Sequence, residues 1–324
     1  MQTNKKVFFI IPTALNEERS ICMRTCPQIS LIYELDSKTV WMAPAFNTNS
    51  FPYDLLLNQL KQLHDLLSGD ESGFHLITRQ AIEESLGSVD NNSRNFIIYQ
   101  LLVEIILQSA RTEASKEIFI NYANDMYAKK NRFIKEIDEF KSSFTPETAI
   151  YWYTRGSFVY RLVNYTCCSN NIQKLFKIRY YICSLHDQIK ELYPKSVSPS
   201  DEKLRVYRGK SMFLEDFLNF KNSIGNFVIT KTFLSTTLDK LVAIYYAGEN
   251  HPEGTVGVIF QMIIDKNLNP AKPFAYIAPQ SAHKDEQEVL VSIATIFRSL
   301  SVEKLEVNQL VFCLNMDKYV CLGS

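Results

Sequence analysis

Three short segments in the second half of the chain combine residue types that can bind an anion and hold a carboxylate. The first reads Leu204-Arg-Val-Tyr-Arg208-Gly209. In a strand, Leu204, Val206 and Arg208 point to one face. An arginine on an otherwise apolar face needs an anion as its partner, and a neighbouring glycine lets a ligand approach the backbone closely. By itself the pattern also fits an arginine at a strand end in a surface ion pair.

The second segment, Phe233-Leu-Ser235-Thr236-Thr237, offers hydroxyl groups. On a strand, Phe233, Ser235 and Thr237 share a face, so two hydroxyls can orient a neighbouring side chain. Serine and β-branched residues are also common in and beside strands, so this segment alone does not predict chemistry.

The third segment, Asp285-Glu286-Gln287-Glu288-Val-Leu-Val291, brings two carboxylates. In an extended chain Glu286 and Glu288 point the same way, about 7 Å apart. Glu288 leads directly into an apolar strand, and a carboxylate at the mouth of a core lies where its pKa can be tuned. A solvated acidic turn before a strand is the alternative.

These segments lie after Pro199, where the hydrophobic period changes from helical to extended. We expect strands at 204–208, 254–264, 289–297 and 310–316, one or two strands within 227–237, and a short helix over 239–247 that ends at Gly248. Residues 95–193 are mostly helical, with helices at 96–108 and 170–192 and a helix start at Thr145-Pro146. A helical half followed by a β-rich half predicts an α+β fold.

The first 91 residues differ from the rest. Short strands are expected at 7–11, 31–35 and 39–42 and a helix at 53–68, and the polar segment 87–93 fits a linker. We therefore expect an N-terminal α/β extension over residues 1–91, whose role the sequence does not indicate. A second unit follows over 92–324, helical to residue 199 and β-rich from residue 200.

Composition excludes several classes of protein. The chain has 324 residues, of which 46% are hydrophobic, so it can bury a sizeable core. Lys+Arg and Asp+Glu are both 35, and this balance does not indicate a nucleic-acid partner. No run approaches the roughly 18 apolar residues of a membrane span, and the apolar run at 7–11 is too short for a signal peptide. The seven scattered cysteines favour a reduced, cytoplasmic chain, with a secreted form carrying some disulfide bridges as the alternative. The five histidines are isolated, so we expect no metal site.

Taken in order, the three segments resemble the R-S-E class of arginine-specific mono-ADP-ribosyltransferases, a family of animal enzymes and related bacterial toxins. The resemblance covers residues 92–324, including Tyr151-Trp-Tyr-Thr-Arg155 and Phe158-Val-Tyr-Arg161. It implies a catalytic domain with an NAD cleft in a β-rich sandwich. The implied co-substrate is NAD, with NADP as an alternative, and the implied partner is a protein acceptor with an exposed arginine. The oligomeric state stays open.

The resemblance also implies roles. Glu288 would stabilise the ribose hydroxyl and the oxocarbenium-like cation that develops as nicotinamide leaves, and Ser235 would hold Glu288. Glu286 would engage and deprotonate the incoming guanidinium. Arg208 would bind an NAD phosphate, and the backbone of Gly209 would meet the nicotinamide amide. The expected catalytic residues are Arg208, Ser235, Glu286 and Glu288, and the expected NAD-binding residues are Arg208, Gly209, Ser235, Thr236 and Glu288.

The chain departs from the family's pattern at two places. Thr237 stands where the family has a serine, which keeps the hydroxyl. In the family, the loop before the glutamates usually carries an aromatic residue that helps to position the acceptor. Here His283 lies nearest that place, so acceptor recognition is the role that the resemblance supports least. Two other functions use the same residues: an NAD glycohydrolase with water as acceptor, and an inactive NAD-binding or regulatory module.

Overall fold

The computed structural model of the protein describes residues 7–11, 29–34, 40–42, 74–77, 99–100, 102–107, 109–169, 171–193, 203–222, 224–248, 253–265, 272–304 and 310–316. Strands β1 (Val7–Ile11), β2 (Ile29–Glu34) and β3 (Val40–Met42) form a three-stranded sheet in that order. These agree with the three strands expected near the N-terminus. The helix expected at 53–68 and the linker at 87–93 lie outside the described residues.

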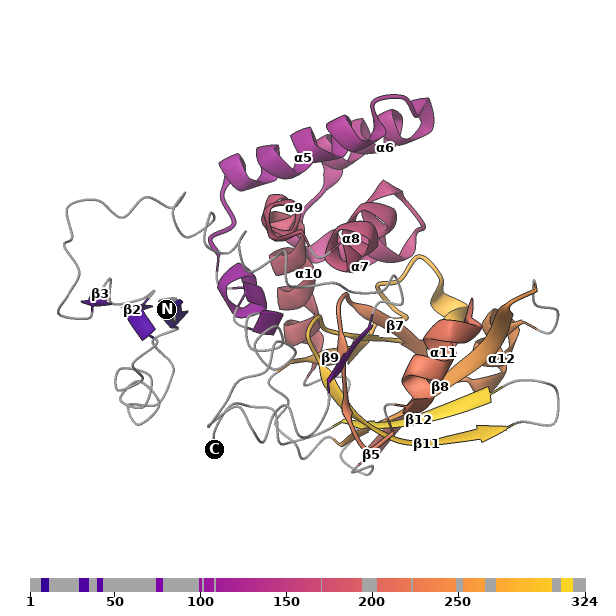
Figure 1. Ribbon diagram of the computed structural model, residues 1–324. Coiled ribbons are helices and arrows are strands. Elements are labelled where there is room, and N and C mark those ends of the chain that lie inside the picture. The colour runs from indigo at the N-terminus through magenta and orange to yellow at the C-terminus, as the bar shows by residue number, and fades with distance from the viewer. Residues whose placement is uncertain are drawn as a thin grey trace.

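Residues 113–192 form a helical layer, which comes before all but the first strand of the main sheet in the chain (Figure 1). Its elements are α5 (Glu113–Tyr127), α6 (Asn131–Ser143), the 3-10 turn η2 (Pro146–Thr148), α7 (Ala149–Thr154), α8 (Phe158–Cys168), α9 (Ile172–Lys177) and α10 (Arg179–Leu192). The single helix expected at 170–192 is two helices, because Ile178 leaves helical geometry with φ −95° and ψ 6°. Ile178 is fully buried in the helical core.

The main sheet has nine strands in the order β4-β6-β11-β12-β8-β5-β7-β10-β9. They are β4 (Phe74–Ile77), β5 (Lys203–Phe213), β6 (Phe227–Thr230), β7 (Leu234–Thr237), β8 (Thr255–Asp265), β9 (Phe274–Tyr276), β10 (Glu288–Val291), β11 (Ile296–Lys304) and β12 (Leu310–Met316). Neighbours are antiparallel except β8 and β12. The α+β class is therefore confirmed, and β4 adds a strand that lies before residue 91.

The sheet curves around one core. Every strand places a buried side chain in that core: Phe74, Val206, Val228, Leu234, Phe260, Phe274, Val289, Phe297 and Phe312. The strand expected at 289–297 is wrong in its extent, since β10 ends at Val291 and β11 begins at Ile296. Between them Ala294 takes a left-handed φ of 62°, and the chain moves from pairing with β7 to pairing with β6.

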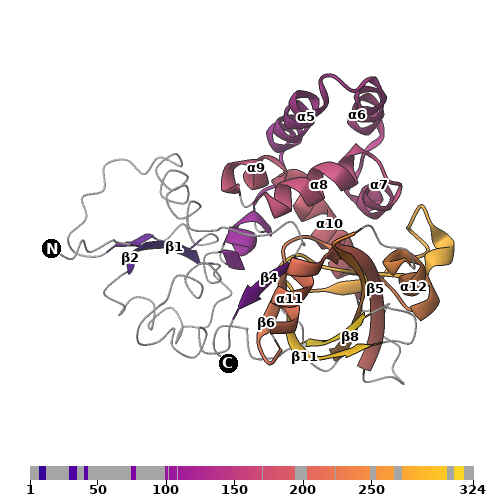
Figure 2. The ribbon, with the colours of Figure 1, turned by 45° about the vertical axis from the view of Figure 1, so that its right-hand side comes forward.

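Two further helices pack on the sheet, α11 (Leu214–Asn222) and α12 (Lys240–Ala247). The side chain of Asp239 caps α12 by accepting from the backbone N–H of Leu241 at 2.8 Å, and Gly248 follows with φ 79°, as expected from the sequence. Figure 2 shows α12 beside β5. The two approach closely because Gly209 has no side chain. A Cβ there would lie 1.7 Å from the carbonyl oxygen of Ala243 and 2.7 Å from the amide nitrogen of Ala247.

Gly209→Ala is therefore expected to destabilise the protein. The added methyl group meets helix backbone, which cannot yield without moving α12, and overpacking of this kind costs about 1–3 kcal/mol. The measurement is the thermal midpoint, with Ser211→Ala, at an exposed position two residues further along the same strand, as the matched control. A Gly209→Ala protein as stable as the control would contradict the close packing of α12 on β5.

Candidate active site

The candidate site lies where β5 and β7 separate. Strand β5 pairs with β8 along its whole length, from Lys203 to Phe213, but it pairs with β7 only through Tyr207 and Thr237. A cavity of about 320 Å³ opens at this divergence. It is lined by all the positions singled out in the sequence: Arg208, Gly209, Ser235, Thr236, Glu286 and Glu288.

Arg208 presents a cation to the cavity. Its Nη1 donates a hydrogen bond to the backbone carbonyl of Ser235 at 2.7 Å, which ties β5 to β7 just beyond their last backbone pair. No carboxylate among the described residues pairs with this half-buried guanidinium. Its remaining donors are therefore available to an anion, as the sequence indicated.

Glu288 is the buried carboxylate of the site, with 5% of its surface exposed. The hydroxyl of Ser235 donates to its Oε1 at 2.5 Å, and the hydroxyl of Ser281 donates to its Oε2 at 3.3 Å. The first bond follows from sheet pairing. Strand β10 lies antiparallel to β7 with Glu288 opposite Thr237 and Leu290 opposite Ser235, so Ser235 is a diagonal neighbour of Glu288 on the same face. Both carboxylate oxygens are thus oriented by neutral donors.

Burial raises the pKa of Glu288 above its ordinary value. The hydrogen bond from Ser235 acts in the opposite direction, the nearby charge of Glu286 raises the pKa further, and Ser281 and His283 lower it. The largest cause is loss of solvent, which the spacing of charges along the chain does not reveal.

The backbone that carries Glu286 differs from the extended segment that the sequence predicted. Glu286 ends a 3-10 turn, η4 (Lys284–Glu286), and Gln287 has a left-handed φ of 45°, so the two glutamates do not lie on one extended segment. The expected extended geometry is therefore wrong. The hydroxyl of Thr237 donates to the backbone carbonyl of Glu286 at 2.7 Å, and the phenol of Tyr246 donates to its Oε1 at 2.9 Å.

The two threonines that follow Ser235 bond to backbone. The hydroxyl of Thr236 donates to the carbonyl of Val289 at 2.6 Å, so it is engaged with β10 although the residue lines the cavity. Thr237 bonds the carbonyl of Glu286 and also accepts from the backbone N–H of Asp239 at 3.0 Å. The threonine in place of the family's serine thus uses its hydroxyl to connect β7, η4 and the start of α12.

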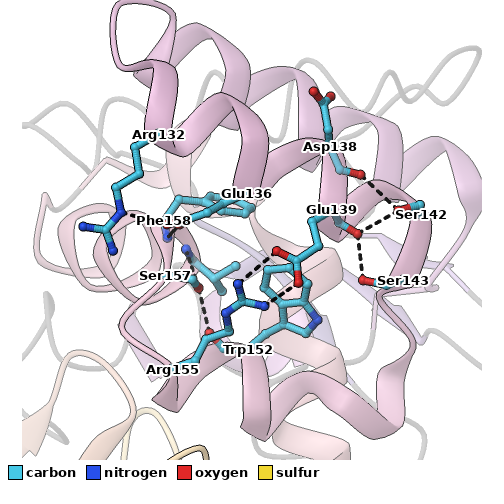
Figure 3. A network of polar contacts seen from close by, with 11 residues as sticks. Arg132, Glu136, Asp138, Glu139, Ser142, Ser143, Trp152, Arg155, Ser157 and Phe158 are labelled. Atoms are coloured by element: carbon cyan, nitrogen blue, oxygen red, sulfur yellow. Dashed lines mark hydrogen bonds and ion pairs between the residues drawn. The ribbon is translucent and has the colours of Figure 1, made fainter.

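Thr154, at the end of α7, and Gly156, in the turn to α8, also line the cavity. Figure 3 shows the polar network that holds this turn against α6. Arg155 donates to both carboxylate oxygens of Glu139, at 2.7 and 2.9 Å, and Glu136 accepts from the backbone N–H of Phe158 at 2.8 Å. Gly156 makes the turn with φ 67°.

Two residues beside Glu286 and Glu288 had no signal in the sequence. Tyr246 lines the cavity from α12, and Ser281 reaches Glu288 from the loop before η4. A hydrogen bond from the backbone N–H of Ala282 to the hydroxyl of Thr154, at 2.9 Å, joins this loop to the α7–α8 turn. Only tertiary contacts bring these residues to the site.

In the described part of the chain, no helix has the length and apolar character needed to cross a membrane. The same residues contain no cluster of three or more His, Cys, Asp or Glu side chains that could hold a metal ion.

No protein-family model and no curated protein matches the sequence. Similar solved structures include the ADP-ribosyltransferase HopU1 of Pseudomonas syringae pv. Tomato DC3000, at 19% identity over 64% of this chain and 99% of that chain, with a TM-score of 0.44. The Vis toxin, an ADP-ribosyltransferase from Vibrio splendidus, is 18% identical over 67% and 92% of the two chains, with a TM-score of 0.40. The eucaryotic mono-ADP-ribosyltransferase ART2.2 is 19% identical over 67% and 94%, with a TM-score of 0.40. These structures are all ADP-ribosyltransferases.

Proposed function

We propose that this protein is an NAD-dependent mono-ADP-ribosyltransferase that modifies arginine side chains. One observation carries the proposal. Arg208 donates to the backbone carbonyl of Ser235 at 2.7 Å, and the hydroxyl of Ser235 donates to the carboxylate of Glu288 at 2.5 Å. All three residues line one cavity. A cation, a hydroxyl and a buried carboxylate in that arrangement match the roles that the sequence resemblance implies.

The cavity suits one end of a dinucleotide. Its volume of about 320 Å³ lies at the low end of the range for ligand pockets, roughly 300–1,000 Å³. We therefore expect it to enclose the nicotinamide and its ribose, with a phosphate at the free donors of Arg208. NADP has the same nicotinamide end, so these contacts apply to both dinucleotides.

Glu288 would carry the bond-breaking step. The bond between the nicotinamide nitrogen and C1′ of the ribose breaks, and its electron pair leaves with nicotinamide, which becomes neutral. Positive charge then develops on the ribose. An ionised carboxylate held in place beside that charge stabilises it, more strongly in a buried site than in water. The hydroxyls of Ser235 and Ser281 keep the Glu288 carboxylate in one orientation for this step.

Glu286 would carry the bond-forming step. A guanidinium nitrogen of the acceptor attacks C1′ and forms the new C–N bond, and the proton that it loses goes to the Glu286 carboxylate. A carboxylate matches the planar donor fork of a guanidinium, which favours arginine as the acceptor. Glu286 is half-buried at the cavity, so a side chain can reach it from solvent.

The test is incubation of the protein with NAD and agmatine, a small guanidine. We expect an ADP-ribosyl-agmatine adduct in the same amount as the nicotinamide released, both measured by chromatography with mass detection. Release of nicotinamide without an adduct would identify an NAD glycohydrolase instead. Binding of NAD without any release would identify an inactive module.

A further inference from the structure

We propose that Tyr246 is a positioning residue that orients the Glu286 carboxylate for an incoming guanidinium. By this means it favours transfer to arginine over hydrolysis of NAD. The inference rests on the proposed function and adds a residue that no motif in the sequence indicated. Its basis is the hydrogen bond of 2.9 Å from the Tyr246 phenol to Oε1 of Glu286.

Glu286 needs such support because the sheet does not orient its side chain. It lies before β10 on the turn η4, and the left-handed Gln287 separates it from the strand. Thr237 of β7 donates a hydrogen bond to the backbone carbonyl of Glu286, and Tyr246 of α12 donates one to the Glu286 carboxylate. Within the part of the chain that the structure describes, no other side chain donates a hydrogen bond to this carboxylate.

The helix that carries Tyr246 is itself well anchored. Asp239 caps its first turn, and its backbone packs directly on Gly209 of β5. Tyr246 therefore reaches Glu286 from a rigid element, which is the usual requirement for holding a functional side chain in one orientation.

The chemistry of the contact suits a guanidinium acceptor. A phenol that donates to Oε1 leaves Oε2 and a second lone pair of Oε1 open to a planar donor fork. The phenol is a donor at neutral pH, since the ordinary pKa of tyrosine is about 10. The hydrogen bond to Glu286, followed by partial burial, raises the pKa of Tyr246 to about 12. Water as an acceptor needs no such fork. Loss of the phenol should therefore reduce transfer more than hydrolysis.

The neighbouring Tyr245 provides a matched control. It lies on the same helix, its ring packs edge-on against that of Tyr246 with centroids 5.6 Å apart, and 81% of its surface is exposed. Among the described residues its hydroxyl has no hydrogen-bond partner. The changes Tyr246→Phe and Tyr245→Phe each remove one hydroxyl from adjacent rings, so a general effect on α12 would appear in both.

The experiment compares wild type, Tyr246→Phe and Tyr245→Phe in two assays: adduct formation with agmatine, and nicotinamide release from NAD without agmatine. A hydrogen bond to a charged but partly exposed group predicts about a tenfold loss of adduct formation at low agmatine concentration for Tyr246→Phe. The loss should appear as a higher KM for agmatine, while release without agmatine and all values for Tyr245→Phe stay close to wild type. In a Glu286→Gln background, Tyr246→Phe should have little further effect, since the two residues act as a pair.

Equal changes in both assays, or the same change in Tyr245→Phe, would overturn the inference, and so would an unaltered Tyr246→Phe protein. If wild type itself forms no adduct, both this inference and the arginine-directed function fail. A wild type that forms the adduct together with an unaltered Tyr246→Phe variant rejects the role of Tyr246 alone.

Discussion

Replacing Glu288 with glutamine is expected to abolish catalysis and at the same time to stabilise the fold at neutral pH. Glutamine keeps the shape and can still accept from Ser235, but it has no charge to offset the cation that develops on the ribose. Removal of a preorganised electrostatic group typically costs about 10²–10³-fold in rate. We expect nicotinamide release from NAD to fall at least as far.

The stability effect follows from the raised pKa of Glu288. A carboxyl group whose pKa is higher in the folded than in the unfolded state binds its proton more tightly when folded. The folded protein is therefore favoured at low pH, and this contribution is lost as pH rises through the folded pKa. At neutral pH the ionised Glu288 is a net cost to stability, which glutamine removes. The advantage of the variant should shrink as pH falls through the folded pKa.

Thermal midpoints over a pH series, together with nicotinamide release, measure both effects. Glu215→Gln, the same chemical change at an exposed position of α11, is the control and should alter neither quantity. Release within tenfold of wild type would remove Glu288 from the mechanism. If the thermal midpoint of Glu288→Gln at neutral pH were lower than that of wild type, the argument that the buried charge of Glu288 destabilises the fold would be wrong.

Replacing Glu286 with glutamine is expected to separate transfer from hydrolysis. General bases typically contribute about 10²–10⁴-fold, so adduct formation with agmatine should fall by about 10²-fold or more. Nicotinamide release without agmatine should change much less, because Glu286 is not the carboxylate assigned to the developing cation. The ratio of adduct to nicotinamide, measured at saturating NAD, reports the separation directly.

Asp285→Asn serves as the control for this change, since Asp285 is an exposed acid next to Glu286 on the same turn. It should leave the ratio of adduct to nicotinamide at the wild-type value. A parallel loss of both products in Glu286→Gln would mean that Glu286 assists bond breaking as well, and the division of roles between the two glutamates would not hold.

Local patterns in the sequence determined much of this protein. Alternation over Leu204–Arg208 predicted β5, and the pair of Asp239 and Gly248 marked the helix α12 between them. Such features depend on neighbours within a few residues, and side chains at that range set backbone preference and capping. The resemblance of the three segments, taken in order, to a known family singled out positions that line one cavity.

Contacts between distant segments were decided only by the tertiary structure. The break between α9 and α10 at Ile178 and the left-handed backbone at Gln287 occur without a glycine or proline, so residue type does not indicate either one. Burial, the main cause of the raised pKa of Glu288, depends on every layer around it. Tyr246 and Glu286 stand 40 positions apart and meet only because α12 packs on β5 beside η4. A sequence pattern shows which side chains a segment carries and which face they share. The contacts that each side chain makes depend on how the helices and the sheet pack together.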